Sequence, residues 1–180
     1  WDEAEPCAQT ALEEAASKLS GVGYSIKDIC LPPQFDSIEQ PFRVISNYEG
    51  KNALADEFRN HMSNMNSWMQ ETGNSNWSEK DYCIAVCAAD TARSALGSLL
   101  KDTPILLTPS TAGEAPPDLE SVTMSSFNRM WTLMHGPTMT LPVSAGPNGM
   151  PVGIQIVAGV GEDALLIARS LEIMRILQSV

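Results

Sequence analysis

The chain has 180 residues, of which 43% are hydrophobic and 18% are charged, and this composition is typical of a globular protein rather than a disordered one. Its formal net charge of −11, with eleven Lys and Arg that form no basic patch, argues against a nucleic-acid partner. No apolar run approaches the ~20 residues of a membrane-spanning helix, so we expect no membrane partner either. Four cysteines without close, even spacing indicate reduced thiols and a cytoplasmic protein.

The first predicted element is a helix over residues 4–19, where apolar residues recur at helical spacing before Gly21 ends it. Residues 22–31 then predict a strand that stops at Pro32. A helix, a glycine turn and a strand form half of a βαβ unit, whose first strand would precede Trp1. We therefore expect the chain to be cut from a longer protein.

The middle of the chain is predicted to be helical. Residues 36–71 show a loose helical pattern of apolar side chains, and residues 72–76 make a loop. A strong helix follows over residues 79–100, with Cys83 and Cys87 on the same face. Because no further ligands occur at the spacing that zinc requires, we interpret these two cysteines as core residues and predict no metal site.

Strands and helices alternate in the remaining part of the chain. The predicted elements are a buried strand at 104–108, a helix around 123–134, a strand at 138–143, a second strand at 151–158 and a helix at 163–177. The turn signal Pro147-Asn148-Gly149 favours a hairpin between the two later strands. The last helix is apolar almost all round, so we expect it to be largely buried. Together the elements predict an α/β fold, a mixed twisted sheet flanked by helices, as one domain over residues 1–180.

The last third also carries the most specific motifs. They are Asn-Arg-Met-Trp-Thr at 128–132, Gly-Pro at 136–137, Leu-Pro at 141–142 and Gly-Met-Pro-Val-Gly-Ile-Gln at 149–155. In this order they resemble the C-terminal half of the amidase signature family, serine hydrolases that cleave carboxylic amides. The resemblance implies the second part of that family's fold, hydrolysis of a small-molecule amide to acid plus ammonia or amine, and no metal or organic cofactor.

The catalytic group of that family, a Ser–Ser–Lys arrangement with a Gly/Ser-rich loop, has no counterpart in this chain. The pair Ser125-Ser126 lacks flanking glycines and is typical of a helix start or an exposed pair. Gly50-Lys51-Asn52 is similar to the segment around the family's lysine, but it follows a region that matches the part after the catalytic segment, so we interpret Lys51 as a solvated helix residue. We assign no catalytic residue here and expect the N-terminal half of the same protein to be the partner that supplies the acyl-enzyme serine.

Four residues are the candidates for substrate binding. In the family, the segment that corresponds to Thr108 and Pro109 lies near the substrate region, and Trp131 and Met134 are side chains of the kind that lines an apolar acyl pocket. The alternative for Trp131 and Met134 is a place in the core. The histidines offer no general base, because His61 is expected to be exposed on a helix and His135 to be satisfied in a loop.

Three other functions stay open. The first is the amidotransferase A-type subunit of the same family, although its Tyr-rich C-terminal segment is missing here. The second is a ligand-binding or interaction module without chemistry, and the third is a small hydrolase built on Lys51 and Ser125 or Ser126. An amidase half predicts exposed sheet edges and apolar surface, whereas a module predicts a stable, monodisperse domain. The identity of the amide and the formation of a homodimer are equally open.

Overall fold

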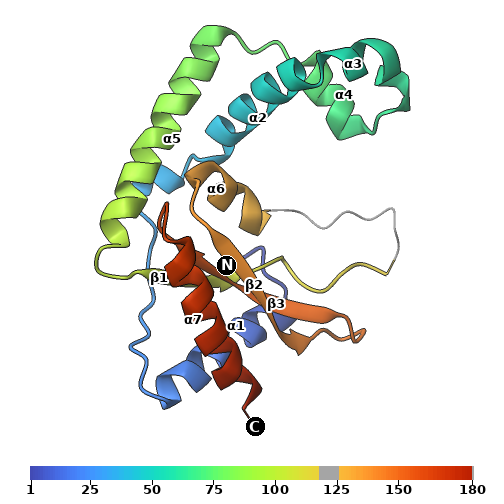
Figure 1. The fold of residues 1–180 in the computed structure, drawn as a ribbon. Helices are drawn as coiled ribbons and strands as arrows, with labels where there is room; N and C mark the ends of the chain where they lie inside the picture. Colours follow the sequence, from blue (N-terminus) through green and yellow to red (C-terminus); the bar gives the residue numbers. More distant parts are fainter. Residues whose placement is uncertain (118–125, 180) are drawn as a thin grey trace. The chain divides into compact units, whose positions relative to one another are not determined.

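The computed structural model describes residues 1–117 and 126–179. The chain divides into two compact units, one made of Trp1–Leu31 with Leu96–Val180 and the other of Pro32–Ala95 (Figure 1). Each unit has its own set of buried residues. That residues 1–180 form one domain stays a prediction.

The larger unit is built on a three-stranded antiparallel sheet with the strand order β1-β3-β2. β1 spans Ile105–Pro109, β2 spans Thr138–Ala145 and β3 spans Pro151–Ala158. β2 and β3 form the predicted hairpin, and its turn closes through a 2.8 Å hydrogen bond from the Gly146 N–H to the Met150 carbonyl. Gly149 has a φ of 82° in this turn, a conformation that glycine adopts without a steric penalty.

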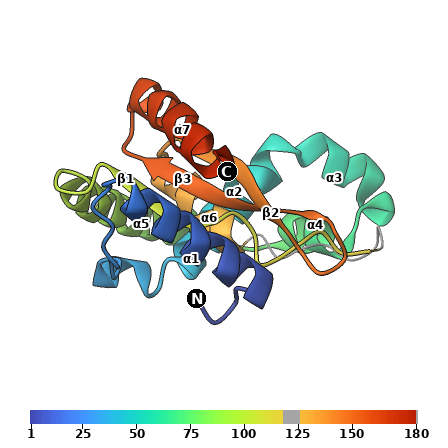
Figure 2. The ribbon, with the colours of Figure 1, turned by 90° about the horizontal axis from the view of Figure 1, so that it is seen from below.

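Two helices cover one face of this sheet. α1 spans Pro6–Gly21 and α7 spans Asp163–Gln178, and the two helices also contact one another (Figure 2). Alternate side chains of β3, among them Ile154 and Ile156, pack against Leu19 of α1 and Leu166 of α7 in one core cluster. α1 buries its alanines at helical spacing, which confirms the predicted helix and lets its backbone approach the sheet closely.

The helix α6, Ser126–Met134, lies against the other face of the sheet (Figure 1). It contributes the buried side chains of Trp131, Leu133 and Met134. Because successive side chains of a strand point to opposite faces, Gln155 and Val157 of β3 face this helix. Both faces of β3 are therefore buried. The first residues of the helix predicted around 123–134 lie outside the described residues.

The expectation that the last helix is largely buried is wrong for one of its sides. Leu166, Ser170 and Ile173 are buried, but the side chains of Ile167 and Leu171 are 49% and 56% exposed. Within the described residues of this unit, α7 packs through one side only, on α1 and the sheet. Its apolar outer side therefore faces solvent.

The strand predicted over residues 22–31 is absent. After α1 the chain continues through residues 24–32 without regular secondary structure, because none of the described strands pairs with it. Tyr24 nevertheless packs against the core cluster below α1 and α7. The Tyr24 hydroxyl and the Arg169 guanidinium stabilise the charged form of Glu172 and hold the pKa of that carboxyl below its usual value.

A buried carboxylate attaches the loop after β1 to the hairpin turn. Glu114 accepts hydrogen bonds from the backbone N–H groups of Asn148 and Met150 at 3.0 and 3.1 Å, and from the side-chain amide of Asn148. These donors compensate the carboxylate for the water that it loses on burial. The loop at residues 110–117 is therefore fixed to the turn of the hairpin.

The smaller unit is helical, as predicted. It contains the short helices η1 (Pro33–Phe35) and η2 (Met62–Asn64), the helices α2 (Glu39–Ala53), α3 (Ala55–His61) and α4 (Ser67–Asn74), and most of α5 (Glu79–Leu99). Thr72 of α4 donates to Asn47 Oδ1 of α2 at 3.2 Å, and both side chains are buried. The rings of Tyr48 and Tyr82 stack with their centroids 4.5 Å apart.

Gly153 is the point of closest packing in the sheet. A Cβ atom at this position would lie 2.8 Å from Thr140 Cγ2, 3.0 Å from the Leu141 carbonyl oxygen and 3.1 Å from Ser110 Oγ. The Leu141 oxygen belongs to the backbone of β2 and cannot rotate away. Glycine is needed here because of space, not because of its backbone conformation.

The two sides of the apolar layer can be compared by truncating one isoleucine on each. Ile154→Ala is expected to lower the free energy of unfolding by about 2–5 kcal/mol, because it opens a cavity at a fully buried position. Ile167→Ala removes the same atoms from the exposed side of α7 and should change it by less than about 0.5 kcal/mol. Urea unfolding measures both, and equal losses would contradict the assignment of buried and exposed sides.

Gly153→Ala is expected to lower the free energy of unfolding by about 1–3 kcal/mol, because the added methyl group meets the backbone of β2. The matched control is Gly97→Ala in α5, where an added Cβ meets nothing within 4 Å and should raise helix stability by about 1 kcal/mol. Circular dichroism melting curves show the sign of each change. A melting temperature that rises for Gly153→Ala would mean that the strands have room at this point.

Candidate functional site

Residues of the motifs in the last third meet in a polar cluster on the α6 side of the sheet. Asn128 of α6 donates from Nδ2 to the Ser110 carbonyl oxygen at 2.9 Å and accepts from Gln155 Nε2 at 2.7 Å. Ser110 donates from Oγ to the Gly153 carbonyl oxygen at 2.9 Å. We call Ser110, Asn128, Gly153 and Gln155 the Asn128 cluster. It joins the loop after β1, the helix α6 and the central strand β3.

The register of the sheet decides which predicted residue lies beside this cluster. Thr108 of β1 and Thr140 of β2 both pair with Gln155, and residues paired in this way share one face of a sheet. Thr108 therefore lies on the α6 side. Pro109 pairs with Ile154, which belongs to the core cluster below α1 and α7, so Pro109 is buried on the opposite face.

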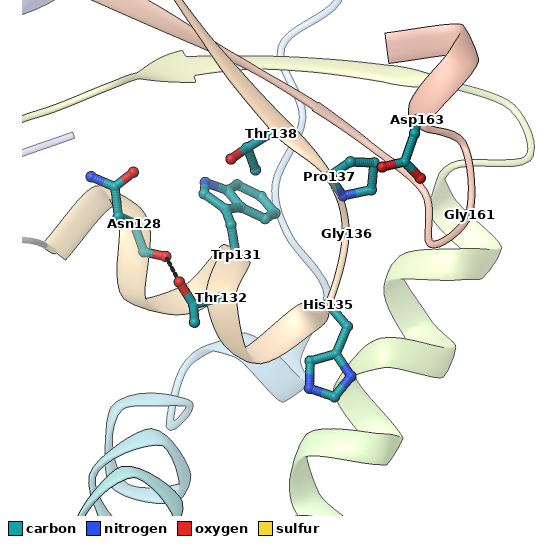
Figure 3. A pocket seen from close by; sticks show the side chains of 9 residues that line it. All are labelled: Asn128, Trp131, Thr132, His135, Gly136, Pro137, Thr138, Gly161 and Asp163. Carbon is teal, nitrogen blue, oxygen red and sulfur yellow. Dashed lines mark hydrogen bonds between the residues drawn. The ribbon is translucent and has the colours of Figure 1, made fainter. Parts of the chain in front are cut away.

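A cavity of about 310 Å³ lies along α6 (Figure 3). Its walls come from α6, from the start of β2 and from the segment that leads into α7, and they consist of Asn128, Trp131, Thr132, His135, Gly136, Pro137, Thr138, Gly161 and Asp163. The lining combines an indole ring with two hydroxyls, an amide, an imidazole and one carboxylate. Such a mixed lining suits a small polar organic molecule.

The helical spacing of α6 links the cavity to the Asn128 cluster. Asn128 and Trp131 are three residues apart, so they lie on the same side of the helix, and both line the cavity. Two buried polar atoms here have no hydrogen-bond partner among the described residues, namely Trp131 Nε1 and Gln155 Oε1. Unpaired buried donors and acceptors are rare in folded proteins, and they mark this side of the sheet as the part of the larger unit to test for function.

The structure separates the four predicted substrate-binding residues. Trp131 is 4% exposed and lines the cavity, while Met134, on the same helix, is fully buried and is not part of the lining. Thr108 lies beside the Asn128 cluster and Pro109 points into the opposite core. Their role in substrate binding stays a prediction. The motifs included Asn128 and Gln155, but only the strand register and the side-chain contacts show that these two residues touch.

The residues considered for catalysis lie elsewhere. Lys51 donates from Nζ to the Ser75 carbonyl in the smaller unit and is only half exposed, so it is not the solvated lysine expected. Ser126 begins α6, and Ser125 lies outside the described residues. His61 is exposed at the end of α3, as predicted. His135 follows α6 with a φ of 60° and lines the cavity.

The prediction that Cys83 and Cys87 are core residues is wrong. Both are exposed on α5, and all four cysteines of the chain are free thiols. The buried stripe of this helix runs instead through Ala85, Ala89 and Ala92. Among the described residues, no three His, Cys, Asp or Glu side chains are grouped so that they could hold a metal ion. No helix in the described ranges is both long and apolar enough to cross a bilayer.

Comparison with known proteins adds a family to this geometry. A family model described as Amidase matches residues 1–167. The fold is similar to that of 6-aminohexanoate cyclic dimer hydrolase complexed with substrate, with a TM-score of 0.80 and 19% identity over 97% of this chain and 42% of that one. A structure described as an amidase gives a TM-score of 0.78 and 23% identity over 93% of this chain and 41% of that one. For a glutamyl-tRNA(Gln) amidotransferase subunit from Thermotoga maritima the values are 0.71 and 18%, over 91% and 37%.

A search of the curated proteins gave no match. Because the identities to the solved structures are low, these structures show a shared fold and no more. The chain spans about two fifths of the length of each of them. The family model, in contrast, covers most of the chain and includes every residue of the Asn128 cluster. The chain therefore belongs to the amidase family.

Proposed function

We propose that the complete protein is an amidase that cleaves the C–N bond of a carboxylic amide through a serine acyl-enzyme. This chain completes the fold and supplies part of the substrate pocket. The observation that carries the proposal is the Asn128 cluster, in which residues from three separate motifs form one hydrogen-bonded unit beside a cavity. A family match that also yields a connected polar site supports an active enzyme more strongly than the fold alone.

The nucleophile is proposed to come from the N-terminal half of the same protein. The sequence contains no Gly-Gly pair, and its single Ser-Ser pair has no glycine beside it, so the loop that would carry an oxyanion hole is missing here. Lys51, the one lysine in a similar context, is engaged with Ser75 in the smaller unit. The chain by itself is then expected to be inactive.

Apolar surface on the larger unit supports a partner of this kind. Ile167, Leu171 and Val160 are 49%, 56% and 67% exposed, which is unfavourable for side chains of this size when they gather on one region. β1 and β2 also pair on one side only among the described strands. The four free thiols agree with a reducing compartment, and we propose a cytoplasmic location.

The proposed pocket is formed by Thr108, Pro109, Trp131 and Met134. Thr108 offers a hydroxyl on the α6 side of the sheet, and Pro109 fixes the end of β1 from the opposite core. Trp131 contributes an apolar wall of the cavity, which suits the acyl part of an amide. Met134 packs in the core at the end of the same helix and holds that wall in place.

The catalytic part of the proposal is tested with a serine-reactive fluorophosphonate on the native protein, followed by intact-mass and peptide mass spectrometry. The expected result is a native chain heavier than these 180 residues that is labelled on a serine outside them. A native mass equal to this chain without labelling would contradict the enzyme and leave a binding module.

Trp131→Phe in the complete protein is expected to raise KM about tenfold for amides with a large apolar acyl group, because part of the aromatic wall is lost. The value of kcat should change by less than about threefold, since the proposed role is binding and not chemistry. Trp68→Phe, at a position 57% exposed in the smaller unit, is the matched control. An equal effect of both substitutions on KM would remove Trp131 from the pocket.

A further inference from the structure

The Asn128 side chain uses both ends of its amide. Nδ2 donates to the Ser110 carbonyl oxygen at 2.9 Å, and Oδ1 accepts from Gln155 Nε2 at 2.7 Å. An aspartate has the same size but no donor, and a leucine has neither donor nor acceptor. Among side chains of this size, only an amide can satisfy both neighbours at once.

We propose that Asn128 is a positioning residue for the substrate, which fixes the distance between Trp131 on α6 and Thr108 on β1. The inference rests on the proposed function, in which these two residues contact the substrate. Asn128 lies one helical turn before Trp131, and its partner Gln155 pairs directly with Thr108. Its two hydrogen bonds are therefore the direct polar link between the helix that carries one residue and the strand pair that carries the other.

The loop after β1 depends on the same side chain. The Ser110 backbone N–H and the Ser110 hydroxyl both donate to the Gly153 carbonyl, at 3.3 and 2.9 Å, so one side of Ser110 is tied to β3. The Ser110 carbonyl on the other side is tied to Asn128. Ser110 is 5% exposed, so water is not a ready substitute for either partner. Loss of Asn128 would free the strand end that begins with Thr108.

Gln155 has no second anchor among the described residues. Its Oε1 atom is buried without a hydrogen-bond partner, and its Nε2 atom donates to Asn128. Removal of the Asn128 side chain would therefore leave the whole Gln155 amide unsatisfied next to Thr108. Residues that are coupled in this way give mutational effects that do not add. The cluster should behave as one unit in a double-mutant cycle.

The experiment uses the complete protein and the substitution Asn128→Asp, which keeps the acceptor for Gln155 but turns a carboxylate oxygen toward the Ser110 carbonyl. The expected result is a loss of at least tenfold in kcat/KM, carried mainly by KM, while the rate of fluorophosphonate labelling changes by less than threefold. The unchanged labelling separates positioning of the substrate from damage to the nucleophile. Asn60→Asp, at an exposed position of α3, is the control for the added charge.

A second set of variants keeps the test independent of one substitution. Asn128→Ala and Gln155→Ala are each expected to raise KM, and the double variant should be no worse than Asn128→Ala alone. A KM within twofold of the wild type for Asn128→Asp in an active, labelled protein would overturn the inference and leave the proposed function intact. Equal losses of labelling, activity and melting temperature would also overturn it, because they indicate a general folding role. A wild-type protein that neither labels nor hydrolyses amides would overturn both proposals.

Discussion

Every layer of the larger unit is attached to β3, because both edges and both faces of this strand are in use. β1 and β2 pair with its two edges, and the residues from Val152 to Ala158 are buried except for Gly153, which is half-buried. Apolar side chains at alternate positions face α1 and α7, while Gln155 faces α6. A strand that is buried on both sides allows little variation in volume, since protein interiors are packed as densely as organic crystals.

The same constraint produces the polar cluster. A glutamine in the middle of a buried strand must find hydrogen-bond partners, and a short antiparallel sheet offers none for its side chain. α6 supplies the partner through Asn128, and Asn128 in turn reaches the loop after β1. The requirement to satisfy one buried amide thus connects three elements that are distant in the sequence. The cavity lies along this helix, where Trp131 forms part of its wall.

The exposed apolar side of α7 belongs to the same balance of burial. α7 packs on α1 and the sheet with one side, and its other side keeps Ile167 and Leu171 in solvent. Exposed isoleucine and leucine on one helix face form a surface suited to a further layer of protein. That surface and the chain's coverage of two fifths of the solved relatives lead to the same proposal, in which a second half of the protein packs on this unit.

The sequence by itself determined the elements that carry a strong local signal. The helical stripe of α1, the long helix α5 and the hairpin turn at Gly149 are set by spacing and by glycine, and they occur as predicted. The motifs of the last third also indicated the family. The stretch at 22–31 has the composition of a strand, but a strand exists only when a neighbour pairs with its backbone.

Burial and contact were decided by the tertiary structure. Cys83 and Cys87 are apolar enough for a core, yet they lie on the outer side of α5, and α7 is apolar all round but has neighbours on one side only. The partners of Asn128 are 18 and 27 residues away along the chain. Local patterns cannot specify such contacts, because they depend on how β1, β3 and α6 pack together. The sequence therefore identified the residues of the candidate site, and only the packing of the sheet showed which of them touch.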